Sequence, residues 1–171
     1  MTLVPNLKTA LTVPLQDLEK NFLNNQSKIE HWFRSKWQVH TPPFYGSVDI
    51  RNCGFKVAPV DMNLYPGGFN NINQQFIPLA VNALNNIISR LCPTASKVLL
   101  IPENHTRNQA YLSNVYSLCH ILKLAGMEVV IGSISSEITA PTEIHLSDGK
   151  TMLYHPIICD KNRIKTKDGF D

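Results

Sequence analysis

The sequence predicts an α/β fold in which a small, mainly parallel sheet is flanked by helices. Two apolar runs, Lys97–Ile101 and Met127–Ile131, stand on either side of a segment of helical pattern over Arg107–Leu124. Short apolar runs that flank a helix are typical of a β-α-β unit with two buried parallel strands. A chain of 171 residues with 43% hydrophobic content can bury a core, and we expect one domain over residues 1–171.

A long amphipathic helix is predicted near the N-terminus, over Leu15–Trp37. Apolar residues recur there at steps of three and four positions, with polar residues between them. Pro14 suits the first helical turn, and Asp17 and Glu19 complement the positive end of the helix dipole. Thr41-Pro42-Pro43 ends the segment, because proline cannot continue a helix.

An extended stretch, a loop and a second helix are predicted next. Phe44–Ile50 has the aromatic and β-branched content of a strand, and Phe55–Val60 continues it. Residues 61–75 are rich in asparagine around a Pro-Gly-Gly sequence, which predicts a loop with sharp backbone turns. Helical spacing then returns from Phe76 to Leu91, and Pro93 ends it.

The helix predicted at Arg107–Leu124 has a capping signal at each end. Thr106 with Gln109 three residues later is a capping-box pattern, and Gly126 stands where a C-terminal cap belongs. After this unit, residues 143–146 and 151–154 alternate around an Asp-Gly turn, which predicts a C-terminal β-hairpin. Because no closing element follows, we expect the chain to be part of a longer protein.

Charge and hydropathy exclude several classes of protein. The formal charge of +3 comes from 16 basic and 13 acidic residues, which is too sparse for the basic stripe of a nucleic-acid-binding surface. No signal peptide is visible, and no run of about 18 apolar residues suggests a membrane span. We therefore expect a cytoplasmic protein with no membrane partner.

The cysteines and histidines do not indicate a metal site. Four cysteines are spaced widely without a Cys-x-x-Cys pair, and we expect buried free thiols rather than disulfides or zinc ligands. The six histidines lack the spacing of metal ligands. No metal-binding residue is therefore predicted.

The first candidate site is the loop Pro102–Asn108, between a predicted parallel strand and the helix that follows. Ligands of open α/β sheets bind at such positions. Backbone N–H groups at the helix start favour an anion, Arg107 can clamp a carboxylate or phosphate, and Glu103 can hold an ammonium group. An amino-acid zwitterion satisfies all three. The alternative, given equal weight, is that Thr106 and Glu103 only cap the helix and His105 is a solvated loop residue.

The second candidate site is the segment Ser47–Asn71, where charged and amide residues alternate with apolar ones. Such alternation on a strand can place a polar site on one face and a packed core on the other. The alternative, which composition alone favours, is a solvent-facing strand with ordinary ion pairs. Gly67-Gly68 does not form a P-loop, because no Gly-Lys-Ser/Thr follows. The polar residues singled out are Asp49, Arg51, Lys56, Asp61 and Asn63, with Asn70 in the loop beyond.

The same segment carries a long and unusual pattern, which continues through Ile101–Asn108 and Gly126–Val129. It resembles the signature of glutamate–cysteine ligases of the proteobacterial type first described from iron-oxidising bacteria. The resemblance spans nearly the whole chain, and members of that family are considerably longer. The residues that carry it are Ser47–Asn52, Gly54–Lys56, Ala58–Asp61, Asn63 and Gly68–Asn71.

The resemblance implies ATP- and Mg²⁺-dependent coupling of the γ-carboxylate of L-glutamate to the amine of L-cysteine, through a γ-glutamyl phosphate, as the first step of glutathione synthesis. The chain would be the N-terminal, substrate-side part, similar to the domain that precedes an ATP-grasp domain, and inactive alone. ATP and Mg²⁺ would bind beyond Asp171, so we expect this chain alone to hold neither tightly. Catalytic residues stay unassigned. Substrate binding near one edge of the parallel sheet is expected of Asp49, Arg51, Lys56, Asp61, Asn63, Asn70, Glu103 and Arg107.

Two other hypotheses stay open at this point. The strand-loop-helix site is also typical of a free-standing α/β module that binds an amino acid or a nucleotide. A truncated gene product that interacts with a full-length ligase is the third hypothesis. The sequence leaves the oligomeric state open, so a homo-oligomer is compatible with all three.

Overall fold

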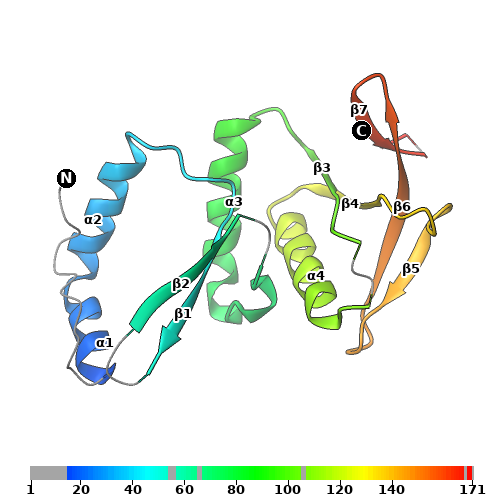
Figure 1. The fold of residues 1–171 in the computed structure, drawn as a ribbon. Helices are drawn as coiled ribbons and strands as arrows, with labels where there is room; N and C mark the ends of the chain where they lie inside the picture. The colour runs from blue at the N-terminus through cyan, green and yellow to red at the C-terminus, as the bar shows by residue number, and fades with distance from the viewer. Residues whose placement is uncertain (1–14, 54–56, 65–66, 105–106, 168, 171) are drawn as a thin grey trace. The chain divides into compact units, whose positions relative to one another are not determined.

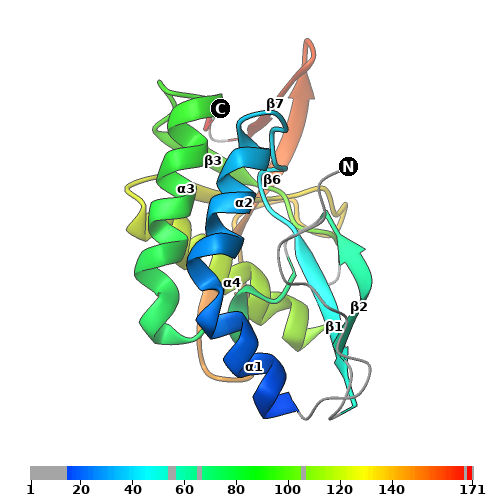
Figure 2. The ribbon, with the colours of Figure 1, turned by 90° about the vertical axis from the view of Figure 1, so that its left-hand side faces the viewer.

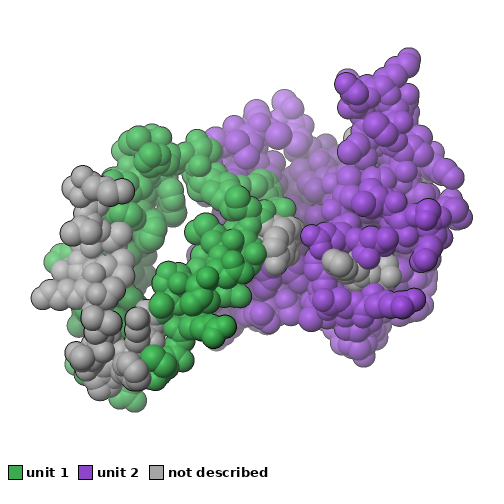
Figure 3. Space-filling model, in the orientation of Figure 1, with its two compact units in different colours: residues 1–65 green, residues 66–171 purple. Residues whose placement is uncertain are grey.

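The computed structural model describes residues 15–53, 57–64, 67–104, 107–167 and 169–170. The chain divides into two compact units, Met1–Tyr65 and Pro66–Asp171, which we call unit 1 and unit 2 (Figure 3). The expectation of one domain over residues 1–171 stays a prediction, because two compact units can belong to one domain.

The described part of unit 1 contains two helices and a two-stranded antiparallel sheet (Figure 1). The helices are α1 (Leu15–Asn24) and α2 (Gln26–Trp37), and the strands are β1 (Ser47–Asn52) and β2 (Val57–Asn63). Among the described residues of this unit, Leu18 alone is a buried hydrophobic residue.

The segment predicted as one long helix is therefore two helices that meet at Asn25. The backbone of Asn25 has φ −112° and ψ 9°, outside the α-helical region. Its side-chain Nδ2 donates to the carbonyl oxygen of Asn21 at 2.9 Å. The backbone N–H of Asn25 also donates to Asn21 O, at 3.2 Å, so the break is a local change of the backbone angles at Asn25. Pro14, the predicted start of the helix, lies outside the described residues.

Unit 2 is a mixed α/β fold built on a five-stranded, mainly parallel sheet, in agreement with the predicted fold class. The strand order is β3-β4-β6-β5, with β7 also paired to β6. Strands β3, β4 and β6 are parallel, whereas β5 and β7 are antiparallel to β6. The strands are β3 (Lys97–Leu100), β4 (Glu128–Ser133), β5 (Thr142–His145), β6 (Thr151–Asp160) and β7 (Arg163–Thr166).

Two helices pack together beside this sheet, as both ribbon views show (Figures 1 and 2). They are α3 (Ile77–Leu91) and α4 (Gln109–Leu124). Short 3₁₀ helices, η1 (Phe69–Asn71) and η2 (Gln74–Phe76), precede α3. The predicted helices at Phe76–Leu91 and Arg107–Leu124, and the predicted strands at Lys97–Ile101 and Met127–Ile131, match α3, α4, β3 and β4 to within three residues at each end.

Helix α4 lies at the centre of the core of unit 2, because it is apolar on two sides. One side packs Leu112 and Val115 against Met152 and Tyr154 of β6. The other side packs against α3 in a second cluster. Full burial of such side chains stabilises a fold by about 1.5–3 kcal/mol each. The buried members of the second cluster are Leu84, Leu118, Ile121 and Leu122.

The two ends of α4 test the predicted capping signals. The N-cap is Asn108, whose Oδ1 accepts a hydrogen bond from the backbone N–H of Tyr111 at 3.2 Å. The predicted capping box with Gln109 is therefore wrong, since Gln109 is the first helical residue; Thr106 lies outside the described residues. Gly126 is confirmed as the C-terminal cap: its φ is +87°, and its N–H donates to Lys123 O at 3.0 Å.

The cysteines differ from their predicted burial. All four are free thiols, as predicted, but only Cys119, on the buried side of α4, is buried. Cys92 is exposed because it follows the last residue of α3, and Cys53 and Cys159 are exposed near the ends of strands.

No helix in the described parts of the chain is long and apolar enough to cross a membrane.

Candidate functional site

The sheet of unit 1 has one polar and one apolar face. Asp49 lies opposite Asp61, and Ser47 lies opposite Asn63. Because side chains alternate across a strand, Arg51 shares the face of Asp49. The other face carries Val48, Ile50 and Met62, all exposed. The polar and apolar residues thus lie on opposite faces, but among the described residues the apolar face is exposed and does not pack against a core, as in the alternative of a solvent-facing strand.

A shift of register brings the two carboxylates opposite each other. Asp49 pairs with Asp61 and Ile50 pairs with Pro59, so Val60 is an extra residue on β2. Such a β-bulge re-aims the side chains near it. Like charges directly opposite each other destabilise a strand pair by roughly 0.2–1 kcal/mol. A cation that binds between Asp49 and Asp61 would remove this repulsion.

An open hollow of about 560 Å³ borders the hairpin and is lined by polar and apolar residues of both strands. Beside the hollow, Asn63 Nδ2 donates to Asp61 Oδ2 at 3.5 Å, a long contact that leaves much of the carboxylate available. Asp49, Arg51 and Asp61 are exposed, and Lys56 lies outside the described residues. The lining residues are Val48, Asp49, Ile50, Arg51, Val60 and Asp61.

The first candidate site, the loop after β3, is attached to the first turn of α4 by a hydrogen bond. The backbone N–H of Glu103 donates to the hydroxyl oxygen of Tyr111 at 2.8 Å. Glu103 and Arg107 are exposed, and Pro102 is buried. Sequence reasoning did not single out Tyr111, because an aromatic residue in a helix is usually a core residue; its hydroxyl has this additional role.

Phe69, the residue before Asn70, is bonded to the same half of α4 by a buried amide. Asn114, only 4% exposed, accepts a hydrogen bond from the backbone N–H of Phe69 at 2.8 Å. Asn114 is six residues beyond Asn108, which is about 9 Å along a helix axis. The structure therefore places Asn70 of η1 on the same half of α4 as the loop with Glu103. The spacing of residues in the sequence did not predict this contact between Phe69 and Asn114.

The predicted site residues are thus divided between the two units. Asp49, Arg51, Asp61 and Asn63 belong to the two-stranded sheet of unit 1, separate from the parallel sheet of unit 2. That all of them gather near one edge of the parallel sheet stays a prediction.

The chemistry of the hairpin face suits a small zwitterion. Two facing carboxylates can hold an ammonium group, and the guanidinium of Arg51 can hold a carboxylate in a bidentate way. Among the described residues, no group of three or more His, Cys, Asp or Glu side chains is placed to bind a metal ion.

Comparison with known proteins gives a consistent result. The family model for glutamate–cysteine ligase matches residues 19–171. The crystal structure at 1.90 Å resolution of a protein from Methylobacillus flagellatus KT, assigned as a gamma-glutamylcysteine synthetase, is similar, with a TM-score of 0.80 and 55% sequence identity. The similarity covers 98% of this chain and 40% of that one, so this chain spans less than half the length of the similar protein. Among curated proteins, no match was found.

Proposed function

Because this chain belongs to the glutamate–cysteine ligase family, we propose that it supplies the substrate-side part of a ligase that joins the γ-carboxylate of L-glutamate to the amine of L-cysteine. We further propose that the ligase depends on ATP and is of the proteobacterial type first described from iron-oxidising bacteria. The family match over residues 19–171 supports the reaction class. A cytoplasmic location stays a prediction.

The observation that carries the substrate-binding role is the pairing of Asp49 with Asp61. Both candidate substrates are amino acids, and each has an ammonium group that two carboxylates can hold. Arg51, two positions along the same strand, would take the α-carboxylate. Such contacts hold the substrate in position, and positioning lowers the barrier of a coupling reaction.

Nucleotide and metal binding are assigned elsewhere in the proposed enzyme. The described residues contain no carboxylate cluster that would hold Mg²⁺. We therefore assign ATP and Mg²⁺ to a part of the ligase outside these residues. Asn63, Asn70, Glu103 and Arg107 stay candidates for substrate contacts, as does Lys56.

Calorimetric titration tests this proposal. The chain is titrated separately with L-glutamate, L-cysteine and Mg-ATP, and ADP release is measured with all three present. We expect one of the amino acids to bind, with neither Mg-ATP binding nor ADP release. ADP release by the chain would overturn the substrate-side assignment. Binding of a nucleotide in place of an amino acid would favour the free-standing binding module.

Two variants locate the binding site. Asp49→Asn removes one of the facing charges, and Arg51→Met removes the guanidinium while it keeps an unbranched, uncharged side chain. Each is expected to weaken amino-acid binding by about tenfold, which corresponds to about 1.4 kcal/mol. Glu137→Gln, an exposed change in unit 2, is the matched control and should leave affinity unchanged. Unchanged affinity in both site variants would exclude the hairpin face.

A further inference from the structure

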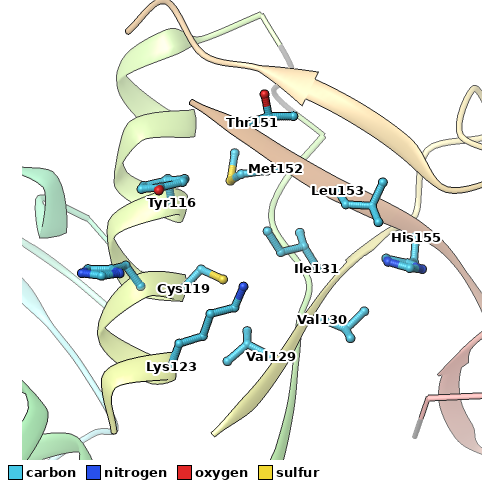
Figure 4. Close-up of a pocket in the computed structure, with 11 residues that line it drawn as sticks. Tyr116, Cys119, Lys123, Val129, Val130, Ile131, Thr151, Met152, Leu153 and His155 are labelled. Atoms are coloured by element: carbon cyan, nitrogen blue, oxygen red, sulfur yellow. The ribbon is translucent and has the colours of Figure 1, made fainter. Parts of the chain in front are cut away.

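A cavity of about 370 Å³ lies between α4 and the strands β4 and β6 of unit 2 (Figure 4). It is separate from the loop with Glu103 and Arg107. Its helical wall includes His120 and Lys123, and Lys123 is 15 residues beyond Asn108, which is roughly 22 Å along a helix axis. The cavity therefore stands toward the opposite end of α4 from that loop.

The cavity exists because two parallel strands diverge. Pairing between β4 and β6 begins at Ile131 and Tyr154. The three residues before Ile131 pair only with β3, and the three before Tyr154 pair only with β5. Since neighbouring strands of a sheet normally lie about 4.8 Å apart, continued pairing here would leave no space for a ligand. The fold thus leaves an opening where a sheet would usually be closed.

The lining combines an apolar wall with basic groups. Val129, Ile131 and Met152 supply apolar surface from the strands. His120 and Lys123 supply nitrogen groups from α4, and none of the eleven lining residues is acidic. Small-molecule sites commonly have volumes of about 300–1,000 Å³ and a few polar groups in a mainly apolar wall. The cavity has a volume in this range, and polar and apolar groups contribute equally to its wall.

Lys123 carries a charge that is not compensated locally. Figure 4 shows its side chain extending from α4 toward the strands, close to Cys119. Among the described residues, no carboxylate lies within ion-pair distance of its Nζ. The charge of Lys123 lowers the pKa of the Cys119 thiol, although the larger effect of burial raises it. Lys123 thus places positive charge at the cavity wall.

Lys150, the other lysine near the cavity, differs from Lys123 because it has an acidic partner. Lys150 Nζ lies 5.1 Å from the centre of the Tyr116 ring, another lining residue. It also forms an ion pair with Asp148 at 2.6 Å, which neutralises its charge. Lys123 is therefore the cation that a ligand in this cavity would meet.

We propose that this cavity binds a small organic carboxylate with a short apolar body, whose carboxylate contacts Lys123 and whose body packs on Val129, Ile131 and Met152. A carboxylate fits Lys123 because it compensates the charge. An apolar body fits the strand wall because burial there removes apolar surface from water. The site is distinct from the amino-acid site proposed on the hairpin of unit 1, and it does not depend on ligase activity.

Titration monitored by ¹H–¹⁵N NMR tests the proposal on the full chain. Isovalerate is the probe; isovaleramide has the same shape without the charge, and acetate has the charge without the apolar body. We expect saturable shifts of the amides of residues 129–131 and 151–153 with isovalerate. Affinity should be at least about tenfold lower with either of the other two compounds, or about 1.4 kcal/mol.

The variant Lys123→Met removes the charge and keeps an unbranched side chain. Because Lys123 is exposed, the variant should fold, and the dispersion of the NMR spectrum checks this. We expect it to lose the preference for isovalerate over isovaleramide. Lys97→Met, on β3 and outside the lining, should keep that preference.

A second measurement uses the buried thiol in the wall. Isovalerate should slow alkylation of Cys119 by iodoacetamide in the wild type, measured by peptide mass spectrometry, and should not slow it in Lys123→Met. The exposed Cys92 serves as the internal control. Equal binding of isovalerate and isovaleramide, equal binding in Lys123→Met, or no saturable shift at these amides would each overturn the proposal.

Discussion

The side-chain oxygen of Asn114 accepts a hydrogen bond from the backbone N–H of Phe69 at 2.8 Å, across 45 positions of sequence. Asn114 is buried in α4, and Phe69 begins η1, so this bond ties the loop with Asn70 to the core helix. Removal of the Asn114 amide leaves the backbone N–H of Phe69 without this bond in a partly buried position.

We predict that Asn114→Ala lowers the free energy of unfolding of unit 2 by about 1–3 kcal/mol, the usual cost of an unsatisfied buried group. Urea unfolding followed by far-UV circular dichroism measures this change. Ser117→Ala is the matched control, because Ser117 Oγ bonds only within α4, to Ser113 O at 2.9 Å. If the two variants lose equal unfolding free energy, the bond to Phe69 contributes no more to stability than a bond within α4.

Gly132 lies where β4 is closely packed by its neighbours. A Cβ atom there would stand 2.5 Å from Ile157 Cγ2 and 3.1 Å from Leu99 Cδ1. We predict that Gly132→Ala destabilises the chain by about 1–3 kcal/mol through overpacking. The added variant Ile157→Ala should recover part of that loss, as a double-mutant cycle of urea unfolding would measure.

Gly126→Ala is the control for the double-mutant cycle of Gly132 and Ile157. Nothing lies within 4 Å of a Cβ at Gly126, but its φ of +87° strains any residue with a side chain. The expected loss of about 1–2 kcal/mol comes from the backbone and should be unaffected by Ile157→Ala. Recovery at both glycines would contradict the steric explanation for Gly132.

Burial of Tyr154 predicts a loss of stability at alkaline pH. Desolvation raises the pKa of its phenol from 10.0 to about 12, and the neighbouring Tyr111 and Cys119 add to the shift. Between these two values the folded chain keeps a proton that the unfolded chain has released. Stability is therefore full below pH 10 and decreases as the pH rises from about 10 toward about 12.

Tyr154→Phe removes the titrating group and keeps most of the packing. We expect the difference in unfolding free energy between pH 9 and pH 11 to be smaller in this variant than in the wild type, by about 1 kcal/mol. Tyr116→Phe, at a half-buried position on α4, is the matched control. An unchanged alkaline loss in Tyr154→Phe would assign the effect to other groups.

The elements of unit 2 were predictable because their signals are local. Apolar runs predicted β3 and β4, and Gly126 marked the end of α4, since a left-handed residue after a helix is nearly always one without a side chain. The break at Asn25 was missed because its neighbours keep helical spacing, and the break is a change in the backbone angles of this one residue. At the start of α4, Thr106 and Asn108 offer similar capping groups, and spacing alone favoured the wrong one.

The candidate site was predictable in residue type but not in geometry. Alternation along the sequence showed that Asp49 and Arg51 share a face. It could not show that Asp61 lies opposite Asp49, because the register depends on how two separate strands pair, and the extra residue Val60 changes that pairing. The cavity beside Lys123 has the same origin, since the place where β4 and β6 diverge is set by tertiary packing.

The pairing of Asp49 with Asp61 predicts opposite effects of one substitution on stability and binding. Asp61→Asn removes the repulsion between the two carboxylates, so unit 1 should become more stable by about 0.2–1 kcal/mol. The gain should shrink at high salt, because the pair is exposed and salt screens it. Both tryptophans of the chain, Trp32 and Trp37, lie in α2, so tryptophan fluorescence during urea unfolding reports on unit 1.

The same substitution should weaken amino-acid binding, because half of the negative charge that would hold the ammonium group is lost. A stability gain together with weaker binding is typical of a residue kept for function at some cost to the fold. Glu137→Gln should change neither quantity. If the variant is more stable but its affinity is unchanged, the repulsion between the two carboxylates is confirmed, and Asp61 does not belong to the substrate site. A variant of lower stability would instead show that Asp61 supports the hairpin, and that its opposition to Asp49 is not the dominant interaction there.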